Sequence, residues 1–213
     1  NEVFWMDSIT DSIYRSNLDG TSPSLVLDMN TALGVFNYGP QGMAAFGSHI
    51  YWVDPITDSI YRAGFDGSSP TQLVDLDTEI GVLNYDLQGL TTDGIYLYYE
   101  DIITDVIYRS DIDGQNTITL IDIETELGTG NYDPRSVTTD GTDLYWLEQT
   151  TDSIYASDLD GSNFRKVLDT PIEGATRLAA SSVPEPSTNI LFGLGTFMLF
   201  LCKRNRKVST LRR

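Results

Sequence analysis

The apolar and polar positions of this chain recur with a fixed period of 47 residues. A Thr-Asp pair, one variable residue and an Ile-Tyr pair begin at Thr10, Thr57, Thr104 and Thr151. Aromatic pairs keep the same step at Phe4-Trp5, Tyr51-Trp52, Tyr98-Tyr99 and Tyr145-Trp146. Asp-Gly pairs do so at Asp19, Asp66, Asp113 and Asp160. A fixed period of this length predicts a repeat protein in which each repeat is one supersecondary unit.

Within one repeat the pattern predicts four short strands, over residues 43–45, 50–53, 59–63 and 72–76. The first contains small residues, the second is aromatic and β-branched as strands prefer, and the fourth alternates polar with apolar. The Asp66-Gly67 pair predicts a tight turn between the third and fourth strands. No helical periodicity of useful length precedes residue 188. The fold class is therefore all-β, a β-propeller of four-stranded blades; a β-solenoid has shorter coils and lacks the regular hairpin.

The repeat resembles the YWTD repeat of the low-density-lipoprotein receptor class B family. The matching tetrapeptides are Phe4-Trp5-Met6-Asp7, Tyr51-Trp52-Val53-Asp54, Tyr98-Tyr99-Glu100-Asp101 and Tyr145-Trp146-Leu147-Glu148. The turns Leu18-Asp19-Gly20 and Leu159-Asp160-Gly161 match the Leu-Asp-Gly turn of that family. The third position departs from the usual Thr in all four copies. The resemblance covers residues 1–182 and implies the propeller fold, but not the ligands of the receptor.

The number of blades is a separate expectation. Residues 1–182 contain four repeats, and the propellers that they resemble close with six blades. The chain begins at the second strand of a unit, whereas residues 176–180 have the pattern of a first strand. We therefore expect residues 176–180 to pair with the first unit, and two further repeats to precede Asn1 in a six-bladed ring.

The C-terminal segment has three parts. The motif Val183, Pro184, Glu185, Pro186 and Ser187 (residues 183–187) precedes an apolar run at 188–202 and a basic tail at 203–213. The basic cluster comprises Lys203, Arg204, Arg206 and Lys207. This order resembles the PEP-CTERM sorting signal of Gram-negative bacteria. The resemblance implies an exosortase-type processing enzyme as a partner.

The apolar run also predicts a membrane helix on physical grounds. Its 15 residues span about 22 Å as a helix at ~1.5 Å per residue, so Lys203 and Arg204 must snorkel. Because basic flanks favour the cytoplasm, the propeller is expected outside the inner membrane, with later transfer to the surface or medium. A helix docked on the propeller is disfavoured, because the run is apolar all round.

Charge divides sharply between the body and the tail. Residues 1–182 hold 7 Lys and Arg against 30 Asp and Glu, a net charge of −23, whereas residues 183–213 hold 6 against 1, or +5. The acidic body excludes nucleic acid, whose binding requires cationic side chains. The single cysteine, Cys202, allows no intrachain disulfide.

Candidate chemistry in the body is sparse. The only histidine, His49, has Glu2, Tyr96 and Asp143 at its equivalent positions, which predicts a solvated turn. No phosphate loop or nucleophile elbow occurs. We therefore expect no catalytic residues, metal or cofactor, and predict a non-enzymatic binding module for an extracellular protein or polysaccharide. The alternative is a lactonase-type propeller hydrolase with a central metal, which the small inner-strand residues Ala44, Thr91, Thr138 and Ala179 disfavour.

Two repeated loops remain candidates for ligand binding. The Asp-Gly turns superficially match calcium loops without the complete twelve-residue ligand pattern, so hairpin turns are the simpler interpretation. The second set contains Asn37, Tyr38, Asn84, Tyr85, Asn131 and Tyr132. These Asn-Tyr loops precede the first strand of the next blade. They form either inter-blade packing or a ring of tyrosines on a binding face.

Overall fold

The computed structural model describes residues 2–34, 38–81, 85–169, 175 and 177–180. Residues Asn1–Ala180 form one compact unit. The sorting motif, the apolar run and the basic cluster lie outside the described residues, as do Asn37 and Asn84.

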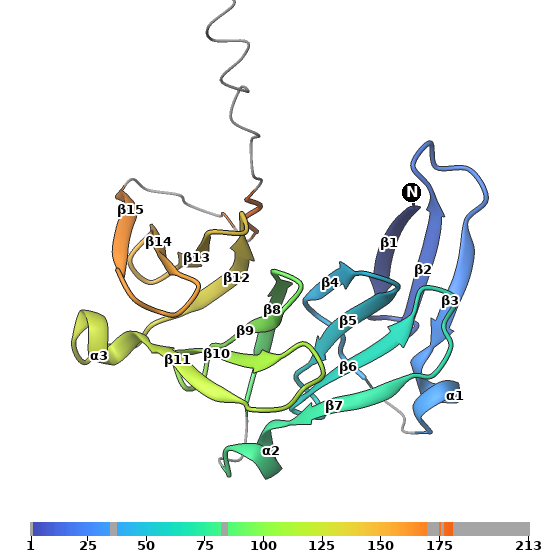
Figure 1. Ribbon diagram of the computed structural model, residues 1–213, viewed down its shortest axis with the longest axis horizontal. Coiled ribbons are helices and arrows are strands. Elements are labelled where there is room, and N and C mark those ends of the chain that lie inside the picture. Colours follow the sequence, from blue (N-terminus) through green and yellow to red (C-terminus); the bar gives the residue numbers. More distant parts are fainter. Residues whose placement is uncertain (1, 35–37, 82–84, 170–174, 176, 181–213) are drawn as a thin grey trace, which may run out of the picture. The chain divides into compact units, whose positions relative to one another are not determined.

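The described strands form four antiparallel sheets, in which strands that follow one another along the chain are paired (Figure 1). The first sheet contains β1 (Glu2–Asp7), β2 (Ser12–Asn17) and β3 (Ser24–Asp28). The second contains β4 (Met43–Phe46), β5 (His49–Asp54), β6 (Ser59–Gly64) and β7 (Thr71–Asp75). The third contains β8 (Leu87–Thr92), β9 (Tyr96–Asp101), β10 (Val106–Asp111) and β11 (Ile118–Asp122). The fourth contains β12 (Pro134–Thr139), β13 (Asp143–Glu148), β14 (Ser153–Asp158) and β15 (Arg165–Asp169).

The four sheets share one register, which confirms the predicted strands and the 47-residue repeat. In each repeat, an aromatic residue of the strand β1, β5, β9 or β13 lies opposite a tyrosine of the strand that follows it. The pairs are Trp5–Tyr14, Trp52–Tyr61, Tyr99–Tyr108 and Trp146–Tyr155. The paired rings stack with centroids 5.6–6.1 Å apart. A register shift between the last two strands of each sheet leaves one bulged residue in the outermost strand. These residues are Val26, Leu73, Leu120 and Val167. Such cross-strand pairs and bulges give each blade its shape.

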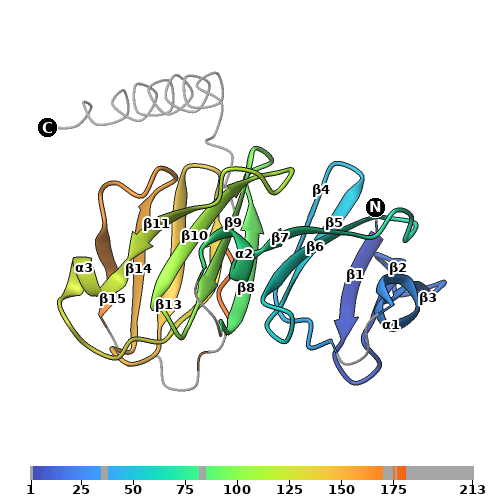
Figure 2. The ribbon, with the colours of Figure 1, turned by 90° about the horizontal axis from the view of Figure 1, so that it is seen from below.

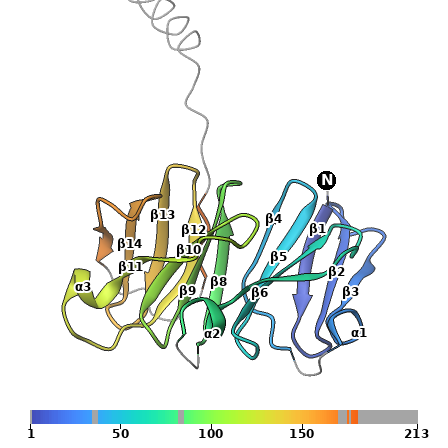
Figure 3. The same cartoon turned by 60° about the horizontal axis from the view of Figure 1, so that its bottom comes forward.

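A short helix follows each of three outer strands, although the sequence shows no helical periodicity of useful length before residue 188. These helices are α1 (Met29–Leu33), α2 (Leu76–Glu79) and α3 (Ile123–Leu127) (Figure 3). Asp28, Asp75 and Asp122 cap them by accepting a hydrogen bond from the backbone N–H three residues later. A helix of one turn is too short to produce a visible period of 3.6 residues. Leu76, predicted at the end of a strand, instead begins α2.

Consecutive sheets lie side by side (Figure 2). The hydrophobic core lies between them. Ile13 and Leu27 of the first sheet pack with Ile50 and Trp52 of the second. One similar cluster joins the second and third sheets, and another joins the third and fourth. Among the described residues, no such cluster joins the fourth sheet to the first.

Residues 177–180 do not form the expected first strand, which corrects the expected pairing with the first unit. Leu178 donates its backbone N–H to Ser136 Oγ at 2.6 Å, and Ala180 donates its N–H to Thr138 Oγ1 at 3.4 Å. These two hydrogen bonds to hydroxyl side chains place residues 177–180 beside β12 of the fourth sheet. Within the described residues, β1 has a paired neighbour only on the β2 side.

Candidate functional site

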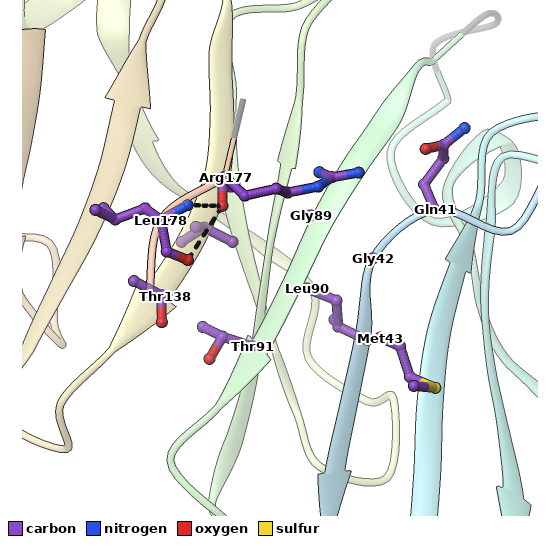
Figure 4. A pocket seen from close by; sticks show the side chains of 11 residues that line it. Gln41, Gly42, Met43, Gly89, Leu90, Thr91, Thr138, Arg177 and Leu178 are labelled. Atoms are coloured by element: carbon purple, nitrogen blue, oxygen red, sulfur yellow. Dashed lines mark hydrogen bonds between the residues drawn. The ribbon is translucent and has the colours of Figure 1, made fainter. Parts of the chain in front are cut away.

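The innermost strands β4, β8 and β12 line a cavity of about 220 Å³ together with residues 177–178 (Figure 4). Its lining residues are Gln41, Gly42, Met43, Gly89, Leu90, Thr91, Ser136, Val137, Thr138, Arg177 and Leu178. Clefts where several elements converge are the usual location of ligand sites. This cavity is therefore the candidate functional site.

Small residues allow the inner strands to approach one another. A Cβ atom on Gly42 would lie 2.5 Å from the backbone nitrogen of Leu90, so no side chain fits there. A Cβ atom on Gly89 would collide with the carboxylate of Glu100. The inner strands contain small residues as predicted, including Ala44 in β4 and Thr91 in β8.

Hydroxyl groups and one cation supply the polar character of the cavity. Ser136 Oγ accepts the Leu178 N–H and donates to the Leu178 carbonyl at 3.3 Å. Arg177 is exposed, and its side chain extends towards Gly89 in Figure 4. The site can therefore offer hydroxyl groups and a guanidinium to a polar ligand.

Glu100 lies fully buried beside the cavity and links the third blade to the fourth. Its carboxylate accepts the backbone N–H groups of Ser136 at 2.6 Å and Val137 at 3.1 Å. These two residues form the bulge of β12, where Ser136 has a φ of +61°. Burial raises the pKa of Glu100 to about 7, although the two N–H donors and Arg177 act in the opposite direction.

The acidic residues at the fourth tetrapeptide position have a structural role in three blades. Asp54, Asp101 and Glu148 are fully buried. Asp54 accepts the N–H groups of Ile56 at 2.9 Å and Gly39 at 2.8 Å, joining the turn after β5 to the loop before β4. Asp101 and Glu148 hold the equivalent loops in the same way. The pKa of Asp54 is raised overall, because the effect of burial exceeds the lowering by these hydrogen bonds.

The Asp-Gly turns use their carboxylates internally. Asp19 accepts both the N–H and the hydroxyl of Thr21, and Asp160 does the same with Ser162. Hydroxyl and N–H donors lower the pKa of both carboxyl groups. Within the described part of the chain, no group of three or more His, Cys, Asp or Glu side chains is arranged to hold a metal ion.

The Asn-Tyr loops place their tyrosines between blades. Tyr38 and Tyr85 are buried in the clusters that join the first three sheets. Tyr132 is partly buried against the third cluster, and its N–H donates to Asp105 Oδ2 at 3.2 Å. Asn131 is exposed. The two buried tyrosines do not face solvent, because an apolar ring gains more from packing between sheets.

The remaining candidates lie apart from the cavity. His49 begins β5, and its Nδ1 lies 3.3 Å from Ser48 Oγ. In the regions that the structure describes, no helix is both long and apolar enough to cross a membrane. The sorting residues 183–186 and the cluster at 203–207 fall outside those regions.

Sequence reasoning missed the linkage made by Glu100. A signal for this role was present in the sequence. Glu100 is charged, whereas the equivalent residues of the other three repeats, Met6, Val53 and Leu147, are apolar. Arg177 was also missed, because nothing in the repeat pattern places residues 177–178 beside β12.

Comparison with solved structures supports propeller blades. A chain in the crystal structure of a nidogen/laminin complex is 25% identical, with a TM-score of 0.61, over 78% of this chain and 60% of that one. A catalytically inactive virginiamycin B lyase from Staphylococcus aureus with quinupristin is 16% identical, with a TM-score of 0.63, over 86% and 58%. A putative TolB from Agrobacterium tumefaciens is 15% identical, with a TM-score of 0.56, over 79% and 61%.

These similarities extend over only part of each matched chain. The chain spans about three-fifths of the length of the solved chains that it matches. The two with lower identity bear on the fold alone. No protein-family model and no curated protein sequence matches the chain.

Proposed function

We propose that this chain is a non-enzymatic binding module of the bacterial cell envelope, exported and sorted by an exosortase-type enzyme. The observation that carries the binding role is the 25% identity to a chain in a nidogen/laminin complex, which is a complex between proteins. The ligand of the present chain is an extracellular protein or a polysaccharide.

The use of the carboxylates supports a role without catalysis. Catalytic acids and bases must be able to reach a substrate. Asp54, Asp101 and Glu148 are instead buried and hold turns and inter-blade loops. Glu100 is occupied by two backbone N–H groups.

The cavity among the inner strands is the proposed contact site for the ligand. We would immobilise the full chain in mild detergent and add purified envelope polysaccharide or solubilised envelope proteins of a Gram-negative host. Arg177→Ala should weaken saturable binding at least tenfold. The matched control Arg62→Ala, which removes the same charge from β6, should leave binding unchanged.

The alternative, a lactonase-type hydrolase, predicts a different outcome. A panel of lactones and aryl esters would be incubated with the chain in the presence of Ca²⁺, Zn²⁺ or Mn²⁺. The binding module should give no hydrolysis above a heat-denatured sample. Metal-dependent turnover, together with a stoichiometric bound metal, would replace the proposal by the hydrolase.

Sorting requires its own test. In a host with an exosortase, the chain should lose its C-terminal segment, and Pro184→Ala with Glu185→Ala should prevent the mass change. In a host without processing, protease added to spheroplasts should digest the propeller and spare an epitope after Arg213. Protection of the propeller would contradict the orientation set by Lys203, Arg204, Arg206 and Lys207.

A further inference from the structure

The junction between the third and fourth blades contains a carboxyl group where the preceding junction has an apolar side chain. Glu100 in β9 is fully buried, as is its equivalent Val53, which packs in the cluster that joins the second and third blades. The Glu100 carboxylate lies against Gly89 of β8, in the space that a Cβ atom on this glycine would need. A group that can gain or lose a charge therefore lies between two blades.

This carboxylate is linked through the β12 bulge to residues 177–180. A register shift leaves Ser136 and Val137 outside the ladder that β12 forms with β13. Their N–H groups donate to Glu100 instead, at 2.6 Å and 3.1 Å. The Ser136 hydroxyl accepts the N–H of Leu178 at 2.6 Å and donates to its carbonyl at 3.3 Å. The hydrogen bonds thus run from Glu100 through Ser136 to Leu178.

Residues 177–180, called the strap below, are held less firmly than the blades. The strap belongs to no strand, and two of its four residues are exposed. It is bound to β12 by the hydroxyl groups of Ser136 and Thr138. The third and fourth blades, by contrast, are joined by a cluster of buried apolar side chains. Water therefore reaches Glu100 more easily by displacement of the strap than by separation of the blades.

Two opposing effects set the charge of Glu100. Burial raises its pKa, whereas the two N–H donors and the Arg177 guanidinium lower it, and the net result is a pKa of about 7 against an ordinary value of 4.5. Burial therefore outweighs the favourable contacts. In a state where water reaches the carboxyl group, its pKa would return towards the ordinary value, so ionisation favours that state.

Other ionisable side chains around Glu100 have partners of their own. β8 carries no ionisable side chain, and Arg135 of β12 is paired with a carboxylate. On the Glu100 face of β9 and β10, Tyr98 donates a hydrogen bond and Arg109 makes a cation–π contact. Arg177, in the strap, is the charged group that acts on Glu100. The strap therefore lies near the carboxyl group and carries the opposite charge.

We propose that the strap is closed over Glu100 while the carboxyl group is protonated and is released when the group ionises. In the closed state Arg177 and Leu178 line the cavity among the inner strands. Release removes this part of the cavity wall as the pH rises above neutrality. That consequence for ligand contact rests on the proposed function, whereas the strap itself can be tested without a ligand. The two can therefore fail separately.

Trypsin cleavage after Arg177 measures release, because proteolysis follows the population of the open state. The full chain in mild detergent would be digested at pH 8 and the products followed by mass spectrometry. Glu100→Gln keeps the size of the side chain without its charge, so cleavage after Arg177 should be roughly tenfold slower or more. Cleavage after Arg165 in β15 should not change and serves as the internal reference. The control Glu126→Gln removes an exposed carboxylate and should be cleaved like the unmodified chain.

A second substitution tests the link through Ser136. Glu100→Gln combined with Ser136→Ala should restore fast cleavage after Arg177, because Leu178 then has no hydroxyl partner. Equal cleavage in the unmodified chain and in Glu100→Gln, with both keeping the β-type circular dichroism spectrum, overturns the proposal. Faster cleavage in Glu100→Gln also overturns it, since the ionised carboxylate would then be what holds the strap.

Amide hydrogen exchange extends the test across pH. Exchange of the Leu178 N–H, corrected for its intrinsic rate at each pH, should accelerate roughly tenfold or more between pH 5 and pH 8. Glu100→Gln should show no such acceleration. At each pH this exchange should be faster than that of the core amides of β5 and β6, which report unfolding of the whole domain. A Leu178 amide that exchanges only together with the core would show that no separate release occurs.

Discussion

The first and second blades have the same local structure but different burial. Trp5 stacks on Tyr14 with centroids 5.7 Å apart, and Trp52 stacks on Tyr61 at 5.6 Å. Asp28 and Asp75 cap equivalent helices. Yet Trp52 is fully buried, whereas Trp5 is more than one-third exposed.

This difference separates what a repeat determines by itself from what its neighbours supply. Register, stacking and capping depend on residues within about twenty positions, so the two blades share them. Burial of the backward face depends on a preceding blade, and Trp52 has the first blade there. In repeat proteins, the free energy of folding is accordingly the sum of the stability of each repeat and the interface energies between neighbouring repeats.

The largest expected effect compares the two tryptophans. Trp52→Ala should lower the free energy of unfolding by about 3–5 kcal/mol, because it removes a buried side chain and leaves a cavity. Trp5→Ala should cost less than half of that, since its ring is already partly hydrated. Urea unfolding of the full chain, followed by circular dichroism at concentrations where it is monomeric, measures both. Equal losses would show that burial by the neighbouring blade is not what distinguishes the two positions.

The second prediction concerns the junction between the third and fourth blades, where Glu100 stands in place of Val53. Its pKa is raised from 4.5 to about 7 by burial. Between those values the folded state binds more protons than the unfolded state, so stability falls as pH rises through this window and stays low above it. The fall attributable to Glu100 is on the order of 3 kcal/mol.

Glu100→Gln should abolish that part of the pH dependence. The difference in unfolding free energy between the unmodified chain and the variant should therefore change between pH 4.5 and pH 8, in favour of the variant at the higher pH. Glu126→Gln, on the exposed side of α3, is the control and should leave the profile unchanged. Parallel profiles for the unmodified chain and Glu100→Gln would mean that folding does not raise the pKa of Glu100.

The sequence predicted what is periodic and local. The aromatic pairs, the Asp-Gly turns and the strand at residues 59–63 repeat four times, so their structure followed from their residue types. The short helices were missed because one turn is shorter than any useful window. An Asp-x-x-Thr pattern at Asp28, Asp75 and Asp122 would have indicated their caps.

The site could not be predicted in the same way. Glu100 departs from the repeat, and its partners Ser136 and Val137 lie 36 and 37 residues away. The position of Arg177 depends on hydrogen bonds of the neighbouring Leu178 to a hydroxyl of another strand. Contacts that occur once in a repeat protein leave no periodic signal.

The smallest expected effect concerns the helix caps. It tests whether interactions within a blade contribute equally to stability in the first and second blades. Asp28→Ala and Asp75→Ala each remove a carboxylate that accepts a backbone N–H at the start of a short helix, from Thr31 at 3.1 Å and Thr78 at 3.2 Å. Each should lower the free energy of unfolding by about 1 kcal/mol, the usual cost of losing a cap. The two losses should agree closely, in contrast to the tryptophan pair, because a cap acts on its own helix whatever lies beside the blade. A loss at Asp75 several times that at Asp28, in the same urea experiment, would show that the neighbouring blade also determines the cap.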